Sequence, residues 1–105
     1  MAQFKGGSVH VANDVIDLII ASTAAKVEGV FEVKGYDEKA RRLRRGYKKH
    51  IRTAVQDGTL STALVLRVAK GTPILGTVEA VQEHVAKQVR SMLGLSCERV
   101  DIQVM

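Results

Sequence analysis

The sequence predicts an α+β fold, a single small domain in which two helices cover a mixed β-sheet. Two stretches carry apolar residues at the three- and four-residue spacing of an amphipathic helix, and each is followed by a glycine. Five shorter stretches alternate or are continuously apolar, as strands are, and the combined order is β-α-β-β-β-α-β. We expect one domain over residues 1–105, with a loose N-terminus at 1–7 and a basic linker between strands at 36–48.

The first third of the chain predicts a strand, a helix and a second strand. Residues 8–11 form a brief strand, and Asn13 is the expected N-cap of a helix over residues 14–28. A glycine ends this helix, and residues 30–35 follow as a short strand. The helix has one apolar side, expected to be buried, that comprises Val15, Ile16, Ile19, Ile20, Thr23, Ala24 and Val27.

The next stretch predicts a hairpin. Ile51, Thr53 and Val55 alternate with more exposed positions, as in a half-buried strand. Asp57-Gly58 favours a tight turn, because glycine accepts the positive φ that such turns require. Residues 60–69 are apolar on nearly both faces, which predicts a central strand.

A second helix and a last strand complete the predicted fold. Pro73 suits the first turn of this helix, which runs to about residue 93 and ends at Gly94. Its expected buried side comprises Val78, Val81, Val85, Val89 and Met92. Residues 97–105 alternate as a strand whose inward residues are Val100, Ile102 and Val104. The core is therefore expected to contain Val81, Val85, Val89, Ile19, Leu64, Leu66 and Ile102.

The segment "KARRLRRGYKKHIR", residues 39–52, holds eight Lys or Arg residues and no carboxylate. Elsewhere eight basic residues face eleven acidic ones, so the formal charge of +5 comes from this one segment. Concentrated charge suits an anionic partner, because salt screening limits the distance over which charges reinforce one another. The residues expected to bind this partner are Lys39, Arg41, Arg42, Arg44, Arg45, Lys48, Lys49 and Arg52.

The conformation of the basic segment stays open between a helix and a loop. As a helix, residues 37–45 would be capped by Asp37, and Ala40, Leu43 and Tyr47 would share one side with the arginines pointing outward. As a solvated loop, the segment would only balance the acidic remainder of the domain. The lack of any acid in the segment favours a binding role, but the sequence does not encode the nature of the anionic partner.

Neither catalysis nor a metal or cofactor site is predicted. His10, His50 and His84 lack the spacing of metal ligands, and Cys97 has no histidine near it in sequence. The glycines are scattered as caps and turns and form no phosphate-binding loop. We expect a protein that is not an enzyme and that has no cofactor, metal or small-molecule substrate. Residues 15–27, the most apolar stretch, are too short and too polar to span a bilayer.

Recognition of RNA bases is disfavoured, although the predicted element order is close to that of RNA-recognition domains. "RGY" at residues 45–47 opens like their central motif, but basic residues follow where that motif has small and aromatic ones. Without aromatic side chains the sheet offers no platform on which bases stack. Charge-driven contact with phosphates needs no platform and remains the alternative function of residues 39–52.

Three stretches carry a resemblance to a known family: "VANDVIDLIIASTAAKVEGVFEVKG", "VQDGTLSTALVLRVAKGTPI" and "VQEHVAKQVRSMLGLSCERVDIQV". In this order, over about ninety residues, the chain resembles the alkaline shock protein, or Gls-type, envelope stress response family of Gram-positive bacteria. It departs from the family in its short and unusually basic linker. The resemblance implies a cytoplasmic, often membrane-proximal, non-enzymatic protein that tends to self-associate.

The expected function is therefore that of a non-catalytic scaffold or adaptor in the envelope stress response or in envelope homeostasis. Its expected partners are a second copy of itself and a membrane-anchored protein or an anionic surface, with nucleic acid as the alternative. The expected location is the cytoplasm, peripheral to the inner face of the cell membrane. If the last strand lies at a sheet edge, its unpaired N–H and C=O groups are available to a second chain.

Overall fold

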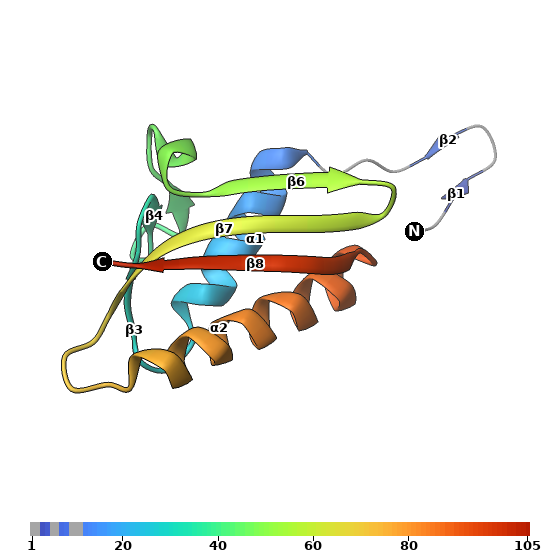
Figure 1. The fold of residues 1–105 in the computed structure, drawn as a ribbon. Coiled ribbons are helices and arrows are strands. Elements are labelled where there is room, and N and C mark those ends of the chain that lie inside the picture. Colours follow the sequence, from blue (N-terminus) through green and yellow to red (C-terminus); the bar gives the residue numbers. More distant parts are fainter. Residues whose placement is uncertain (1–2, 5–6, 9–11) are drawn as a thin grey trace.

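The computed structural model describes residues 3–4, 7–8 and 12–105 and confirms the α+β class, with two helices and a mixed sheet (Figure 1). Most of the strand predicted at residues 8–11 lies outside the described residues. The helices are α1 (Asn13–Ala25) and α2 (Ile74–Gln88), the latter continued by a wide π turn at Val89–Leu93. The strands are β1 (Gln3–Phe4), β2 (Gly7–Ser8), β3 (Val30–Val33), β4 (Tyr36–Asp37), β5 (Arg42–Leu43), β6 (Arg52–Gln56), β7 (Thr59–Val68) and β8 (Ser96–Val104).

Strand β7 is the central strand, as predicted. On one side it pairs in parallel with β8 over most of its length. On the other side, antiparallel β6 pairs with its first half and antiparallel β3 with its last residues. The predicted tight turn joins β6 to β7, with φ of 52° at Asp57 and 75° at Gly58. Positive φ at both central residues is the conformation that matches the twist of a two-stranded hairpin.

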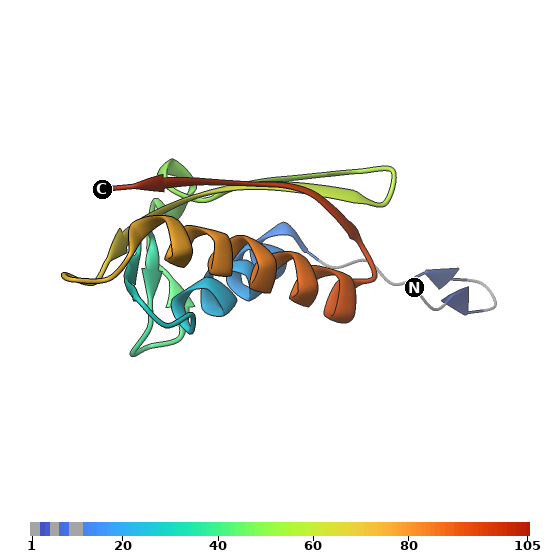
Figure 2. The same cartoon turned by 60° about the horizontal axis from the view of Figure 1, so that its bottom comes forward.

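Both helices lie on one face of the sheet, and no described element covers the other face (Figure 2). Burial along β7 therefore alternates, with Leu60, Leu64 and Leu66 turned toward the helices, rather than extending to both faces as its sequence suggested. The prediction of the core is confirmed for five residues, each at most 1% exposed: Val81, Val85, Val89, Leu64 and Leu66.

The apolar sides predicted for the two helices need correction. Ile19 is only half-buried and Val15 is 45% exposed, because the buried side of α1 also takes in Asp17 and Ala21 and is thus rotated away from them. Met92 is 57% exposed, because the wide π turn at the end of α2 breaks the α-helical spacing on which its prediction depended.

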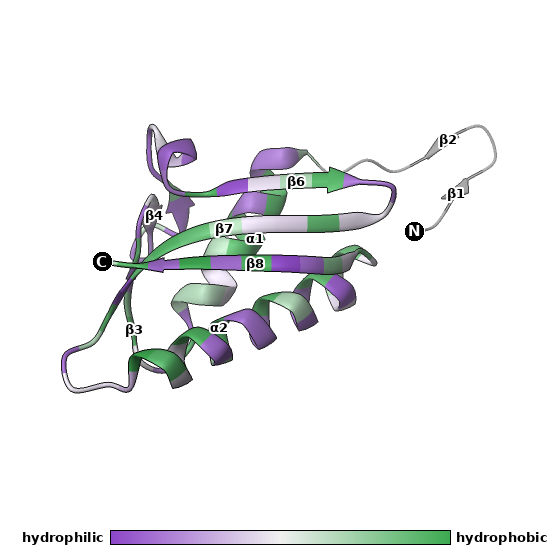
Figure 3. Ribbon diagram, viewed as in Figure 1, coloured by the Kyte–Doolittle hydropathy of each residue, from purple (hydrophilic) through white to green (hydrophobic). Residues whose placement is uncertain are grey.

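Strand β8 is an edge strand, since it pairs only with β7 among the described strands. Its polar and apolar residues alternate, as Figure 3 shows. Ile102, predicted to be buried, is half-buried, and so are Val100 and Val104. These side chains face the helices, but an edge position leaves each of them one neighbouring strand instead of two.

The predicted ends of α1 are also corrected. Asn13 is the first residue of the helix rather than its cap, and Ala12 at the N-cap position provides no side-chain hydrogen bond. The helix ends at Ala25, and Gly29 lies in the turn before β3 with φ of 97°. A Cβ atom at Gly29 would lie 2.7 Å from atoms of Thr72 and Thr77, so glycine is required there both for conformation and for space.

The helix considered for residues 37–45 is wrong. The segment instead forms a two-stranded ribbon, β4 and β5, followed by a 3-10 turn at Tyr47–Lys49. Two details of the helical interpretation survive in another form: the Asp37 side chain caps the turn of the ribbon, and Leu43 packs against the core. Ala40, expected on the same side as Leu43, is exposed.

Candidate anionic-partner site

The eight basic residues predicted to bind an anionic partner fall into two groups. All eight side chains are exposed, and the three ion pairs found in the described part of the chain include none of them. Their charge is therefore available to a partner. The ribbon group, on the β4–β5 ribbon and the loop after it, consists of Lys39, Arg41, Arg42, Arg44 and Arg45. The turn group, on the 3-10 turn and the start of β6, consists of Lys48, Lys49 and Arg52.

The ribbon is a short antiparallel hairpin. Tyr36 pairs with Leu43 and Asp37 with Arg42, which leaves residues 38–41 as the turn. The Ala40 N–H donates to Asp37 Oδ1 at 3.1 Å, as aspartate does at the start of many turns. Two paired residues on each strand are too few to hold a hairpin in water, so the ribbon depends on its packing against the rest of the domain.

The backbone at the ribbon has two uncommon positions. Arg41, the last residue of the turn, has φ of 54°, in the left-handed region that costs a non-glycine residue about 1 kcal/mol. Gly35, with φ of 89°, lies just before the ribbon, and a Cβ atom there would come within 3.2 Å of the Tyr47 backbone. The Gly35 carbonyl accepts a hydrogen bond from the Arg44 N–H at 2.7 Å, which extends the pairing beyond the ribbon.

Two tyrosines fasten the basic segment to the domain. Tyr36 is buried, at 6% exposure. The Tyr47 hydroxyl donates to Oδ2 of Asp17, a buried residue of α1, at 2.9 Å, and Oδ1 of Asp17 has no partner among the described residues. Burial, followed by the hydrogen bond to Asp17, raises the pKa of Tyr47 to about 12. The hydroxyl group therefore stays protonated as a donor over the whole neutral range.

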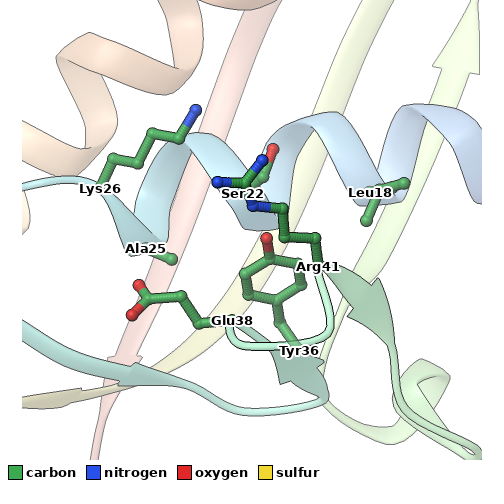
Figure 4. A pocket seen from close by; sticks show the side chains of 7 residues that line it. All are labelled: Leu18, Ser22, Ala25, Lys26, Tyr36, Glu38 and Arg41. Carbon is green, nitrogen blue, oxygen red and sulfur yellow. The ribbon is translucent and has the colours of Figure 1, made fainter.

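A first hollow lies between α1 and the ribbon (Figure 4). Its volume is about 480 Å³, and Leu18, Ala25 and the Tyr36 ring supply its apolar surface. The Arg41 side chain reaches over Tyr36 toward Ser22 of α1, as Figure 4 shows. The full lining is Leu18, Ser22, Ala25, Lys26, Tyr36, Glu38 and Arg41.

A second hollow of about 420 Å³ adjoins the first along α1, and both contain Leu18. Val15 and Leu43 add apolar surface, and three members of the ribbon group surround them. The full lining is Asp14, Val15, Leu18, Arg42, Leu43, Arg44, Arg45, Gly46 and Tyr47. Together, the two hollows form what we call the α1 groove, with an aliphatic floor and five basic residues against two acidic ones.

The arginine charges contribute to the pKa values of two residues of the ribbon, Asp37 and Tyr36. The pKa of Asp37 is lowered, mainly by the hydrogen bond from the Ala40 N–H and further by the charges of Arg44 and Arg42. Tyr36 shows the opposite effect: burial raises its pKa, Glu38 adds to the rise, and the nearby Arg41 opposes it. The arginine charges therefore act on both residues of β4.

The turn group lies apart from the α1 groove. Lys49 and Arg52 line a separate hollow of about 350 Å³ with Asp101 of β8, and Lys48 lines neither hollow of the α1 groove. The structure therefore divides the eight predicted residues into five that lie together around the ribbon, four of them at the α1 groove, and three that do not reach it.

The other chemically notable residues do not converge. His10 lies outside the described residues, and His50 and His84 lie on different elements. In the part of the chain that the structure describes, no three His, Cys, Asp or Glu side chains are grouped to hold a metal ion. Cys97 is half-buried, and burial is the main cause that raises the pKa of its thiol.

Several residues of the site were not predicted from the sequence, among them Leu18, Lys26, Tyr36 and Asp17. Lys26 adds a base to the α1 groove, the Tyr36 ring lines the groove beside its floor, and Asp17 accepts the hydrogen bond of Tyr47. The spacing of Leu18, Ser22 and Lys26 on one side of a helix was a readable signal for a second face of α1. The contact of that face with the ribbon was not readable, because it joins segments far apart in sequence.

The model of the alkaline shock protein 23 family, described as having a cell envelope-related function, matches residues 2–105. No curated protein matches the chain. None of the helices in the described ranges is long and apolar enough to cross a membrane.

Several solved structures of MamM CTD share the fold. One variant aligns with a TM-score of 0.63 over 90% of this chain and 98% of the other, at 16% identity. A second aligns with a TM-score of 0.61 over 87% and 92%, at 18% identity. A third, described as a nickel form, aligns with a TM-score of 0.60 over 87% and 94%, at 17% identity. Similarity at this level of identity concerns the fold alone.

Proposed function

Because the chain belongs to the alkaline shock protein family, whose function is cell envelope-related, we propose that it is a non-catalytic adaptor in the envelope stress response or in envelope homeostasis. It acts through an anionic partner, either a protein or the membrane surface, that binds the exposed basic residues. We place it in the cytoplasm, at the inner face of the cell membrane.

One observation carries this proposal: eight basic side chains lie exposed on one short stretch of chain, and none takes part in an ion pair of the described residues. A ribbon of two-residue strands contributes little core of its own. Like charges this close together destabilise the ribbon, and an anionic partner would offset that cost, so a purely structural role explains them poorly.

A non-catalytic role is supported by what surrounds the reactive side chains. The raised pKa of Cys97 keeps its thiol protonated at neutral pH, the inactive form for a nucleophile. The face of the sheet away from the helices carries Ala54, Ser61, Ala63 and Val65 along β6 and β7, none of which is aromatic, and the exposed Phe31 of β3 already lies against Arg67. Base stacking has no support there, so the alternative of nucleic-acid binding would depend on phosphate contacts alone.

Self-association is the second part of the proposal, and the edge position of β8 supports it. The Met105 N–H donates to the Leu66 carbonyl of β7, so in an extended strand the backbone groups of alternate residues, Ile102 and Val104 among them, point away from β7. The Val100 carbonyl is already bonded by the Gln82 side chain of α2 at 3.0 Å. The remaining outward groups are suited to antiparallel pairing with a second copy.

The test compares the parent protein with an Arg41/Arg42/Arg44→Glu variant. A control with the same change of charge, Lys70/Lys87/Arg90→Glu, alters exposed residues outside the basic segment. Binding of the parent and of both variants to anionic vesicles and to mixed-sequence DNA and RNA is measured at mild salt. Their contacts with membrane proteins are measured by cross-linking in the native cell. We expect the first variant alone to lose contact with vesicles or with an envelope protein.

Two results would overturn the proposal. Tight, charge-dependent binding to nucleic acid with none to vesicles or envelope proteins would establish the alternative function. Equal behaviour of the two variants in every assay would show that the basic segment binds no anionic partner.

A further inference from the structure

The α1 groove has a definite length and direction. It follows one side of α1 from Asp14 to Lys26, which at 1.5 Å per residue corresponds to about 18 Å. An extended peptide covers that distance with about six residues, at roughly 3.3 Å each. Leu18, shared by both hollows, lies in the middle of the floor.

The charge around the groove is one-sided. The acidic residues at its wall are Asp14 and Glu38, and Asp14 is partly satisfied, since its Oδ1 accepts the Val15 N–H at 3.0 Å. The basic residues at its wall are Lys26, Arg41, Arg42, Arg44 and Arg45. Electrostatic complementarity therefore requires an acidic occupant.

The shape and the floor distinguish between kinds of acidic occupant. The floor is concave and aliphatic, formed by Val15, Leu18, Ala25 and Leu43. A flat bilayer surface does not reach the bottom of a groove. Nucleic acid supplies phosphates but no aliphatic groups, and the two tyrosines at the groove are unsuited to base stacking because Tyr36 is buried and Tyr47 is bonded to Asp17. A polypeptide supplies carboxylates and aliphatic side chains together.

We propose that the α1 groove binds an acidic segment of a partner protein, with an aliphatic side chain on Leu18 and carboxylates on Arg41 at one end and Arg42 and Arg45 at the other. This inference rests on the proposed adaptor function and specifies its partner as a polypeptide. Arg44, whose N–H is bonded to Gly35, stands at the wall between β5 and the loop after it.

The test uses three labelled twelve-residue peptides and fluorescence anisotropy. The first repeats Glu-Glu-Leu-Leu, the second has the same number of glutamates with the leucines replaced by glycine, and the third repeats Gln-Gln-Leu-Leu. The protein is used as the full chain in three forms: the parent, Arg41/Arg45→Glu in the groove, and Lys48/Lys49→Glu outside it. The two variants change the charge equally.

We expect the Glu-Glu-Leu-Leu peptide to bind the parent at least tenfold more tightly than either of the other peptides. The Arg41/Arg45→Glu variant should weaken this binding at least tenfold more than Lys48/Lys49→Glu does. A Leu18→Gln variant should reduce the preference for the leucine-containing acidic peptide, and its circular dichroism spectrum and unfolding midpoint show whether it remains folded.

Different results would contradict the polypeptide site in the α1 groove and the adaptor function. Equal binding of the two acidic peptides, or equal effects of the two double variants, would overturn the groove as a polypeptide site. If vesicles still bound in a charge-dependent way, the adaptor function would stand without the groove. If neither peptides nor vesicles nor envelope proteins bound, both proposals would fail.

Discussion

The hydrogen bond between Tyr47 and Asp17 joins the basic segment to α1, and its removal should weaken the whole domain. In Tyr47→Phe the ring remains, but Asp17 loses the only hydrogen bond that its carboxylate receives from the described residues. Asp17 is 5% exposed, so water replaces the lost donor poorly. A hydrogen bond to a charged group contributes about 1.5–3 kcal/mol, and leaving such a group unsatisfied costs a similar amount.

We therefore expect Tyr47→Phe to lower the free energy of unfolding by about 2–3 kcal/mol. For a domain of this size the midpoint of thermal unfolding should fall by about 10–20 °C. Urea unfolding followed by circular dichroism measures the change in free energy. Hydrogen exchange at the Arg44 N–H, bonded to Gly35 at 2.7 Å, reports whether the ribbon has loosened.

The control is a double-mutant cycle with Asp17→Asn, in which the amide oxygen still accepts the tyrosine hydroxyl. The loss of unfolding free energy caused by Tyr47→Phe should be smaller in the Asp17→Asn background than in the parent, because the hydrogen bond there no longer involves a charge. A loss below about 0.5 kcal/mol for Tyr47→Phe would refute the reasoning, since it would show that Asp17 is satisfied by other means.

Four further changes test other parts of the structure. Leu66→Ala should cost about 2–5 kcal/mol in urea unfolding, because the side chain is fully buried in β7, and unchanged stability would contradict its place in the core. Gly29→Ala should destabilise by more than about 1 kcal/mol, because it is strained at positive φ and lies against Thr72 and Thr77; a neutral result would mean that this turn rearranges. The contribution of Tyr47 to stability should stay constant up to about pH 10 and then fall as the pH rises toward 12, because the folded state holds the Tyr47 proton more tightly than the unfolded state; this part of the pH dependence should be absent in Tyr47→Phe. Val104→Pro removes a backbone N–H that points away from β7 and should shift sedimentation toward the monomer, and a parent that is monomeric at every concentration would remove strand pairing as the mode of self-association.

Local patterns predicted the parts of the fold that depend on local physics. Asp57-Gly58 predicted its turn because the backbone conformation there is a property of two residues. The side of α1 that is buried was predicted with the wrong rotation, because Asp17 is polar and yet lies inside. Its partner Tyr47 is thirty positions away in the chain, and a hydrogen bond over that separation leaves no periodic signal.

The candidate site, too, could be predicted from the sequence only in part. Exposure of all eight basic residues could be predicted, since unpaired Lys and Arg side chains are rarely buried. The α1 groove could not, because Leu18 and Arg41 meet only when the ribbon packs on α1. The ribbon itself lacks the alternating pattern of a strand, since two-residue strands are held by tertiary contacts rather than by their composition.

At Arg41, the backbone conformation that costs stability belongs to the same residue whose side chain is proposed to bind the partner. Glycine would relieve about 1 kcal/mol of backbone strain at φ of 54° and would at the same time remove the guanidinium group from the groove. A variant selected for thermal stability alone would thus tend to lose the arginine, whereas one selected for the binding proposed above would keep it. Arg41 is the position where these two demands on the chain can be separated by a single substitution.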